Sequence, residues 1–485
     1  MNLDAGMLSR IQFGFTAGFH YLFPPLTIGL GWLIFIMEAM YHKTGDKIYE
    51  KMARFWTKLF AVTFAMGVAS GIVLEFEFGT NWSVYSRYVG DVFGSALAAE
   101  GIFAFFLESG FLAVLVFGWD RVSPRMHLFS TLMVALGSTF SAIWIVVANS
   151  WMQTPAGYKI VGEGAYARAE ITSFWELVFN PSSMHRLNHV LFGALILGSF
   201  FVMSVSAWYL LHNRHQDFAK KSFSIALVVG FLACWAILIS GHFQAEKVGH
   251  TQPVKLAAME GHFETGEGGS PMYLFGWPDE QEKKVKYGLA IPYLFSFLMY
   301  FDINKPVPGL DQFPQDEWPP VNITFQTYHL MVMGGMFMIG LTSLAMLLWW
   351  RGKLFEQRWL LWIFVPAVIV PYISNETGWI AAEVGRQPWI VWHLLKTQDA
   401  WSPSLDAQQV LGSLIMFGVV YLLLFAVWIY TLNDKIQKGP DYHPPLPEGP
   451  KGFMAAAEAM ADPSGESMTM AHADENGNGQ KKDGN

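Results

Sequence analysis

Nine apolar runs, each long enough to cross a lipid bilayer, constrain this chain more than any other feature of its sequence. A membrane-spanning helix needs about 20 predominantly apolar residues, and in lipid only helices and closed barrels satisfy their own backbone hydrogen bonds. Charged residues make up only 14% of the chain, whereas soluble domains average about 25%. We therefore expect an all-α integral membrane protein with about nine transmembrane helices. The runs occupy residues 16–40, 56–78, 95–118, 127–150, 187–211, 222–243, 325–350, 359–383 and 408–433.

Lysine and arginine gather in alternate connections, which indicates how the helices are oriented. Short loops rich in these residues stay on the cytoplasmic side of a membrane. Such residues follow the first, third, fifth and seventh runs, whereas the connection 79–94 contains only Arg87. This bias predicts an N-terminus outside and a C-terminus in the cytoplasm. The net charge of −8 and the lack of a long basic run give no sign of nucleic-acid binding.

A long polar region separates two groups of predicted helices. Residues 1–243 contain the first six spans, and residues 325–433 contain the last three. Residues 244–324 are rich in Pro, Gly and charge, and the alternation of the spans makes them a long outer loop between helices six and seven. Residues 434–485 are polar and have the composition of a disordered tail, which we expect in the cytoplasm.

Several ionisable or metal-ligating side chains lie within the predicted spans. Such groups are costly in a membrane and are functional candidates. The single cysteine, Cys234, excludes a cysteine-ligated iron–sulfur cluster and a cysteine-rich zinc site. The candidates are Glu75, Glu77, Glu100, Glu108, Glu376, Glu383, His20, His189, His329 and Met331. Topology places five of them near the outer face, each on a different helix, which predicts a cofactor cluster: His20, Glu75, His189, Met331 and Glu383.

Ordinary structural roles are the alternatives for these residues. A lone histidine or methionine in a helix is more often a packing residue than a ligand. Glu383 has a candidate ion-pair partner in Arg386, three residues further on. Glu100 and Glu108 share one helix face and fit either a polar seam or a proton path. They lie roughly 12 Å apart along the axis, so water or a hydroxyl such as that of Ser141 must bridge them.

Six segments, in order along the chain, resemble subunit I of the cytochrome bd-type quinol oxidases. The resemblance covers nearly all of the chain up to about residue 433, and the short outer loop resembles the short-loop branch, which includes the cyanide-insensitive oxidases. The segments are TAGFHYLF from Thr16, EFEFGTNW from Glu75, EGIFAFFLE from Glu100, Asn180 to His189, KLAAME from Lys255, and Trp379 through the GRQPW motif at 385–389.

This resemblance implies three haem groups. His189 and Met331 would be the two axial ligands of a low-spin haem b. Glu383 would ligate a high-spin haem b. His20 would ligate the oxygen-reducing haem, which is haem d in many members and a further haem b in some.

Further residues take roles around the haems by the same resemblance. Trp379 would lie among the haems on the electron path. Arg386 would bind haem propionates, because a guanidinium group matches carboxylate geometry, and Arg10 is a second candidate by position alone. His329 stands where better-known members carry Arg. An imidazole there can hydrogen-bond a propionate or the quinol, but its charge depends on pH.

The resemblance also implies how protons move. Lys255 and Glu260, in the outer loop, match residues tied to quinol oxidation, and a carboxylate there can accept a proton that the quinol releases. Glu100 and Glu108 match carboxylates that deliver protons toward the oxygen site. These assignments describe a quinol:oxygen oxidoreductase that separates proton release from uptake and has no pump.

The implied partners are a second membrane subunit, subunit II, and in some members a small single-helix subunit. Quinol and O₂ would be the substrates, and the location would be the bacterial inner membrane.

Three other classes of membrane protein fit less well or lack support. A haem–copper oxidase usually has an adjacent histidine pair, and this sequence has none. The cytochrome b of a quinol–cytochrome c reductase needs paired histidines about one span apart, and His189 and His329 have no such partners. A cofactor-free secondary transporter, whose midplane charges bind substrate, is the remaining alternative.

Overall fold

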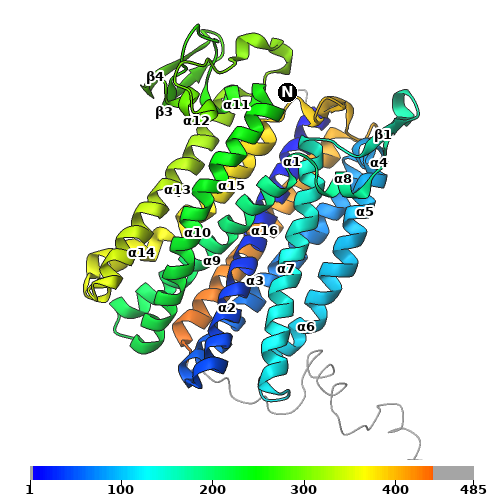
Figure 1. Ribbon diagram of the computed structural model, residues 1–485. Coiled ribbons are helices and arrows are strands. Elements are labelled where there is room, and N and C mark those ends of the chain that lie inside the picture. Colours follow the sequence, from blue (N-terminus) through cyan, green and yellow to red (C-terminus); the bar gives the residue numbers. More distant parts are fainter. Residues whose placement is uncertain (1–3, 441–485) are drawn as a thin grey trace, which may run out of the picture. The chain divides into compact units, whose positions relative to one another are not determined.

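A computed structural model describes residues 4–440, apart from the side chains of residues 103, 105 and 165, and shows a bundle of long helices (Figure 1). The all-α membrane fold is confirmed. Residues 1–3 and 441–485 lie outside the described part, and so does most of the tail predicted at 434–485. The spans long and apolar enough to cross a membrane are α1–α2 (Ala5–Tyr21 and Pro24–Thr44), α3 (Lys47–Thr80), α7 (Pro124–Gln153), α9 (Ser183–Leu211), α10 (Gln216–Thr251), α13 (Val321–Trp350), α14–α15 (Arg358–Ala367 and Ile369–Val384) and α16 (Ala407–Lys438).

The predicted span at 95–118 forms a helix in three pieces. They are α5 (Gly90–Glu100), a π-helical turn (Gly101–Phe105) and α6 (Phe106–Phe117). Single π-helical turns inside α-helices are frequent at functional sites. Glu100 ends α5 and Glu108 lies in the first turn of α6, so the irregular turn separates the two carboxylates.

The first span begins earlier than the predicted 16–40. The Asp4 side chain caps α1 by accepting hydrogen bonds from the backbone N–H groups of Gly6 and Met7. The helix is interrupted before Pro24, which opens α2 and has no N–H to continue the ladder of α1. Apolar content alone missed α1 because this helix carries polar residues such as Ser9 and Gln12.

Short elements gather at the end of the bundle where α1 begins (Figure 1). The predicted loop 244–324 is shorter in the structure, because α10 continues to Thr251 and α13 starts at Val321. The short helices are α4 (Ser83–Tyr88), α8 (Phe174–Val178), α11 (Pro253–Glu260) and α12 (Leu294–Tyr300). The antiparallel pairs are β1–β2 (Tyr158–Val161, Arg168–Ile171), β3–β4 (Met272–Asp279, Lys284–Ile291) and β5–β6 (Trp389–Val391, Leu395–Lys396).

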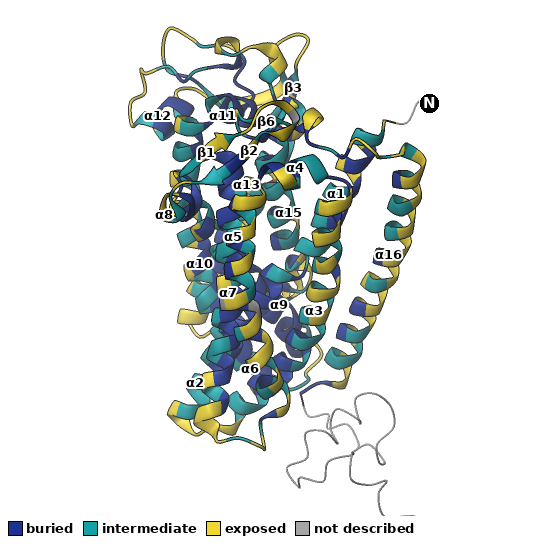
Figure 2. Ribbon diagram, turned by 90° about the vertical axis from the view of Figure 1, so that its right-hand side faces the viewer, coloured by how far each residue is buried: buried dark blue, intermediate teal, exposed yellow. Residues whose placement is uncertain are grey.

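Helix α9 lies at the centre of the bundle, and it touches α2 backbone to backbone. In its most apolar stretch 72% of the residues are buried, against 11% for α16, whose exposed residues are visible in Figure 2. A Cβ on Gly29 would lie 2.2 Å from the Ala194 carbonyl oxygen, and one on Gly198 would lie 2.5 Å from the Gly29 carbonyl carbon. Small residues permit such close packing in a membrane, where van der Waals contact drives helix association.

We expect Gly198→Ala to destabilise the protein, because the added methyl group meets the Gly29 backbone. Overpacking of this kind costs about 1–3 kcal/mol, so the melting temperature of the purified protein should fall. Gly412→Ala on α16 is the matched control, since a Cβ there meets nothing within 4 Å. Equal melting temperatures for the two variants would contradict the close contact of α2 and α9.

Candidate functional site

Glu383, in the last turn of α15, is held by three polar side chains. Asn149 and Gln153, one turn apart on α7, donate hydrogen bonds of 3.0 and 3.2 Å to Oε1. Arg386 donates to Oε2 at 2.5 Å. The ion pair considered from the sequence is therefore present. One carboxylate oxygen accepts two amide groups, and the other accepts one guanidinium.

Lys255 reaches the same group of residues from α11. Its side chain is completely buried, and Nζ donates to Gln153 Oε1 at 2.9 Å and to the Ala382 carbonyl at 2.6 Å. Burial lowers the pKa of Lys255 well below its ordinary value, and the positive charges of Arg186 and Arg386 lower this pKa further. This lysine therefore joins the outer loop to the ends of α7 and α15.

Two guanidinium groups beside Glu383 have buried N–H donors without an acceptor among the described residues. They are Nε of Arg186 and both Nε and Nη1 of Arg386. Arg186 makes only a long contact, 3.5 Å, to Asn149 Oδ1. Since buried donors are normally paired, these groups have capacity for a further carboxylate. We call Glu383, Arg386, Arg186 and Lys255 the cationic cluster.

Arg386 was predicted from the sequence, whereas Arg186 was not. The available signal was its position three residues before His189, on the same face of α9. Arg10, the other candidate for binding carboxylates, is exposed on α1.

His189 and His20 are oriented by the same local device. His189 Nδ1 lies 3.2 Å from the Ser240 hydroxyl, which donates to the Ile237 carbonyl. His20 Nδ1 lies 3.0 Å from the Ser70 hydroxyl, which donates to the Met66 carbonyl at 2.9 Å. Each hydroxyl proton is already used, so each serine oxygen accepts Nδ1–H. We infer that Nε2 of both rings keeps its lone pair for a ligand.

A glycine follows each of these serines and leaves room beside the ring. A Cβ on Gly241 would lie 3.4 Å from His189 Cε1, and one on Gly71 would lie 3.1 Å from His20 Cε1. The Ser-Gly pair therefore both orients and accommodates each imidazole. The sequence carried this signal in the pairs 70–71 and 240–241.

Met331 of α13 lies at about the same depth in the bundle as His189 of α9. A Cβ on Gly378 of α15 would lie only 2.6 Å from Met331 Sδ, so the sulfur occupies space that an alanine would fill. Gly193, one turn beyond His189, meets Asn375 one turn before Gly378. These contacts bring the thioether and the imidazole to one level of the bundle.

Each of the two carboxylates around the π-helical turn is paired with a serine of α7. Ser141 donates to Glu100 Oε1 at 2.6 Å, and Ser138 donates to Glu108 Oε1. A Cβ on Gly137 would lie 2.9 Å from the Glu108 Cβ, which shows how closely α6 and α7 approach. Ser141 was expected from the sequence, whereas Ser138 was not. The result is two pairs, each of one hydroxyl and one carboxyl group, one turn apart on α7.

Glu260 and Lys255 share α11 but face different neighbours. The Glu260 carboxyl is buried beside Tyr328 of α13, and its Oε2 has no hydrogen-bond partner among the described residues. Burial raises the pKa of Glu260 to about 7. The structure therefore separates this carboxyl from the cationic cluster and leaves it able to exchange a proton near neutral pH.

His329 contacts backbone on both sides of its ring. Nδ1 lies 2.9 Å from the Phe325 carbonyl one turn earlier, and Nε2 lies 2.9 Å from the Tyr273 carbonyl of β3. The ring also stacks on Phe325 with 3.8 Å between centroids. His329 thus fastens the β3–β4 hairpin to α13.

Two imidazoles, a thioether and a carboxylate lie toward the end of the bundle that carries the unpaired guanidinium donors. This set of side chains suits a prosthetic group that contains a metal ion. Within residues 4–440, no group of three or more His, Cys, Asp or Glu side chains is arranged to hold a bare metal ion. Imidazole and thioether suit an iron centre, and the guanidinium groups suit carboxylate arms.

Comparisons with known proteins give a family match. Residues 8–440 match the family model "Cytochrome bd terminal oxidase subunit I". The chain is 39% identical to "Cytochrome bd ubiquinol oxidase subunit 1" of Bacillus subtilis, over 90% of this chain and 94% of that one. It is 37% identical to "Cytochrome bd-II ubiquinol oxidase subunit 1" of Escherichia coli, over 89% of this chain and 96% of that one.

A solved structure gives the same result for the fold. The bd oxidase from Geobacillus thermodenitrificans superposes with a TM-score of 0.83 at 30% identity, over 91% of this chain and all of that one.

Proposed function

The chain belongs to the cytochrome bd terminal oxidase subunit I family, and on that premise we propose that it is the haem-bearing subunit of a quinol:oxygen oxidoreductase in the bacterial inner membrane. The observation that carries the proposal is the cationic cluster, whose unpaired guanidinium donors include that of Arg186, one turn before the oriented imidazole of His189 on α9. The family match does not favour a cofactor-free transporter.

The residues divide among three haem sites. His189 and Met331 would ligate a low-spin haem b, Glu383 a high-spin haem b, and His20 the oxygen-reducing haem, which is haem d or a further haem b. Arg386 would bind propionate groups. Bound haem would supply one-electron redox chemistry and the site of oxygen reduction.

Two further residues support this arrangement. Arg186 has one buried N–H donor, at Nε, without an acceptor among the described residues, and it would bind propionates together with Arg386. Trp379 follows Gly378, against which Met331 packs, and precedes Glu383 by one turn. It therefore lies between the two ligands along α15, which fits a role on the electron path.

Quinol oxidation would take place at the outer loop. A quinol that becomes a quinone gives up two electrons and two protons. The free Oε2 of Glu260 would accept a proton and release it to the outer side. Lys255, fixed to Gln153 and Ala382, would position α11 beside the haem ligands, and His329 would position the β3–β4 hairpin.

Protons for water formation would come from the opposite side, which the basic loops assign to the cytoplasm. Glu108 and Ser138 would pass them to Ser141 and Glu100 across the π-helical turn. Release outside and uptake inside make the reaction electrogenic without a pump. We propose subunit II and, in addition, a small single-helix subunit as partners in the lipid bilayer.

Met331→Leu should remove one axial ligand of the low-spin haem while preserving side-chain volume. We expect the low-spin optical signal to fall and carbon monoxide to bind at the opened position. Met333→Leu is the control, because Met333 lies on the same helix and is exposed. An unchanged low-spin spectrum in Met331→Leu would reject the assignment of this ligand.

Glu260→Gln should abolish a pH dependence of quinol oxidation. Because the pKa of Glu260 is about 7, its carboxylate becomes available as a base as the pH rises through 7. The kcat/KM for quinol should therefore rise with pH in the wild type. The variant should lose this inflection in the pH profile, and its rate of quinol oxidation should fall about 10²–10⁴-fold.

An artificial donor that reduces the haems directly provides the control for Glu260→Gln. Oxygen consumption with this donor should match the wild type. A variant that keeps the inflection near pH 7 would show that another group accepts the quinol proton.

Glu108→Gln should slow oxygen consumption with the haems fully assembled, because the amide keeps size and polarity but carries no proton. Glu77→Gln is the control, since Glu77 is also buried and bonded to a hydroxyl, that of Thr16. A polar seam without proton transfer predicts normal turnover in both variants. That outcome, measured at full haem content, would rule out the path through Glu108.

A further inference from the structure

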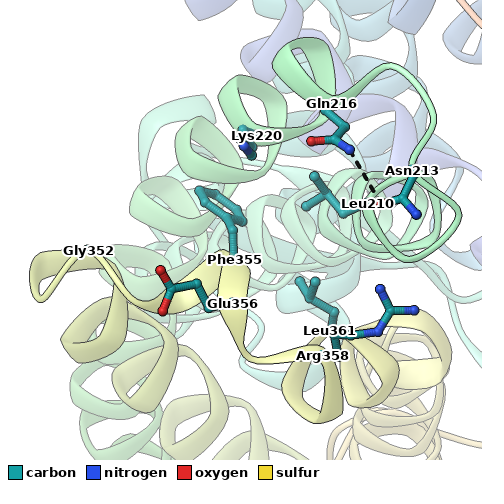
Figure 3. A pocket seen from close by; sticks show the side chains of 9 residues that line it. All are labelled: Leu210, Asn213, Gln216, Lys220, Gly352, Phe355, Glu356, Arg358 and Leu361. Carbon is teal, nitrogen blue, oxygen red and sulfur yellow. Dashed lines mark hydrogen bonds between the residues drawn. The ribbon is translucent and has the colours of Figure 1, made fainter.

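A cavity of about 300 Å³ lies at the end of the bundle opposite the cationic cluster, where basic residues are frequent. It is bounded by the turn between α9 and α10 and by the start of α14 (Figure 3). Polar groups of Lys220, Arg358, Asn213 and Gln216 line it, over a floor that includes buried Leu361. The cavity therefore has a basic, hydrogen-bonding rim and an apolar base.

The charges around this cavity favour an anion. Lys220 and Arg358 supply two positive charges, and Glu356 supplies one negative charge. Arg358 donates from Nη2 to the Leu211 carbonyl at 3.2 Å, which fixes its guanidinium at the end of α9. A guanidinium has five N–H donors, so this bond uses only part of its capacity.

Two helices begin at the cavity, which adds to its positive potential. Helix α10 starts at Gln216 and α14 starts at Arg358, and neither has a side-chain cap hydrogen bond. The first-turn N–H groups of a helix have no partner within the helix, and its dipole is positive at this end. A phosphate group suits this combination of basic side chains and helix starts.

Exposed tryptophans place the cavity at the depth of lipid headgroups. Trp350 at the end of α13, and Trp359 and Trp362 on α14, have exposed fractions of 81, 53 and 55%. Tryptophan is enriched at the membrane–water interface, and Trp359 follows Arg358 directly. The rim of the cavity therefore lies where the phosphates of one leaflet lie.

An apolar groove of about 380 Å³ lies deeper along the same helix. Trp362 and Pro366 of α14 form it together with Phe337 of α13 and Val370 of α15. Pro366 is eight residues beyond Arg358, or about 12 Å further into the bilayer. The dimension and chemistry of this groove suit an acyl chain.

We propose that the cavity binds the phosphate of an anionic phospholipid, with an acyl chain of the same lipid along α14. The lipid would link the ends of α9, α10 and α14. Lys220 and Arg358 would bind the phosphate, and the Trp359 and Trp362 rings would bound the glycerol region. Basic pockets between helix ends are suited to anionic headgroups.

The test compares lipids added to the delipidated oxidase complex. Phosphatidylglycerol should raise the melting temperature more than phosphatidylcholine does. Lys220→Gln/Arg358→Gln should weaken the apparent phosphatidylglycerol affinity about thirtyfold. The charge-preserving Lys220→Arg/Arg358→Lys should retain most of it.

The matched control is Arg351→Gln/Lys353→Gln, which removes the same charge from the adjoining loop outside the cavity lining. It should behave like the wild type. An equal loss of phosphatidylglycerol affinity in both glutamine double variants would indicate that general surface charge attracts the lipid, and it would overturn the proposal. Equal stabilisation by inorganic phosphate alone would also overturn it, because the site would then recognise an ion and not a lipid.

Native mass spectrometry of the wild-type complex gives a readout that does not depend on a folded variant. At least one anionic phospholipid should remain bound per chain after purification in mild detergent. Its complete absence, with the subunits intact, would refute the lipid site.

Discussion

The rest of this structure depends on one constraint. A single carboxylate does not balance the buried positive charge that surrounds it. Arg186, Arg386 and Lys255 surround Glu383 at the outer ends of α7, α9 and α15. A buried charge is costly unless it is paired and hydrogen-bonded. The cluster therefore has capacity for further carboxylates, which the propionates of the proposed haems would supply. Through Lys255 the same cluster also fixes the outer loop where quinol would be oxidised.

The geometry of the proposed ligands depends on the packing around them as much as on the ligating side chains themselves. His20 and His189 are each hydrogen-bonded to a serine of a neighbouring helix, and the glycine after that serine leaves space for the ring. The Met331 sulfur packs against Gly378, where a larger residue would not fit. Partners of this kind set the tautomer and direction of a ligating imidazole. The proposed proton path depends on packing in the same way, because α7 supplies a hydroxyl to each of the carboxylates on α5 and α6.

Features that depend on short segments could be predicted from the sequence, whereas those that depend on contacts between distant segments could not. Bilayer thickness fixes the length of an apolar run, so the spans and the depth of His189 were accessible from the sequence. Helix α1 was missed because its polar residues pack inside the protein. The roles of Arg186 and Ser138 were missed because each depends on a partner in another helix. The different directions of Lys255 and Glu260 depend on α7 and α13, which no local pattern reveals.

A density map of the purified oxidase complex that resolves side chains and haem substituents tests the central claim most directly. The account predicts haem propionates within hydrogen-bond distance of Arg186 and Arg386, with iron ligated by His189 and Met331 at one site and by Glu383 at another. Propionates directed away from both guanidinium groups, with those groups bonded only to protein acceptors, would contradict it.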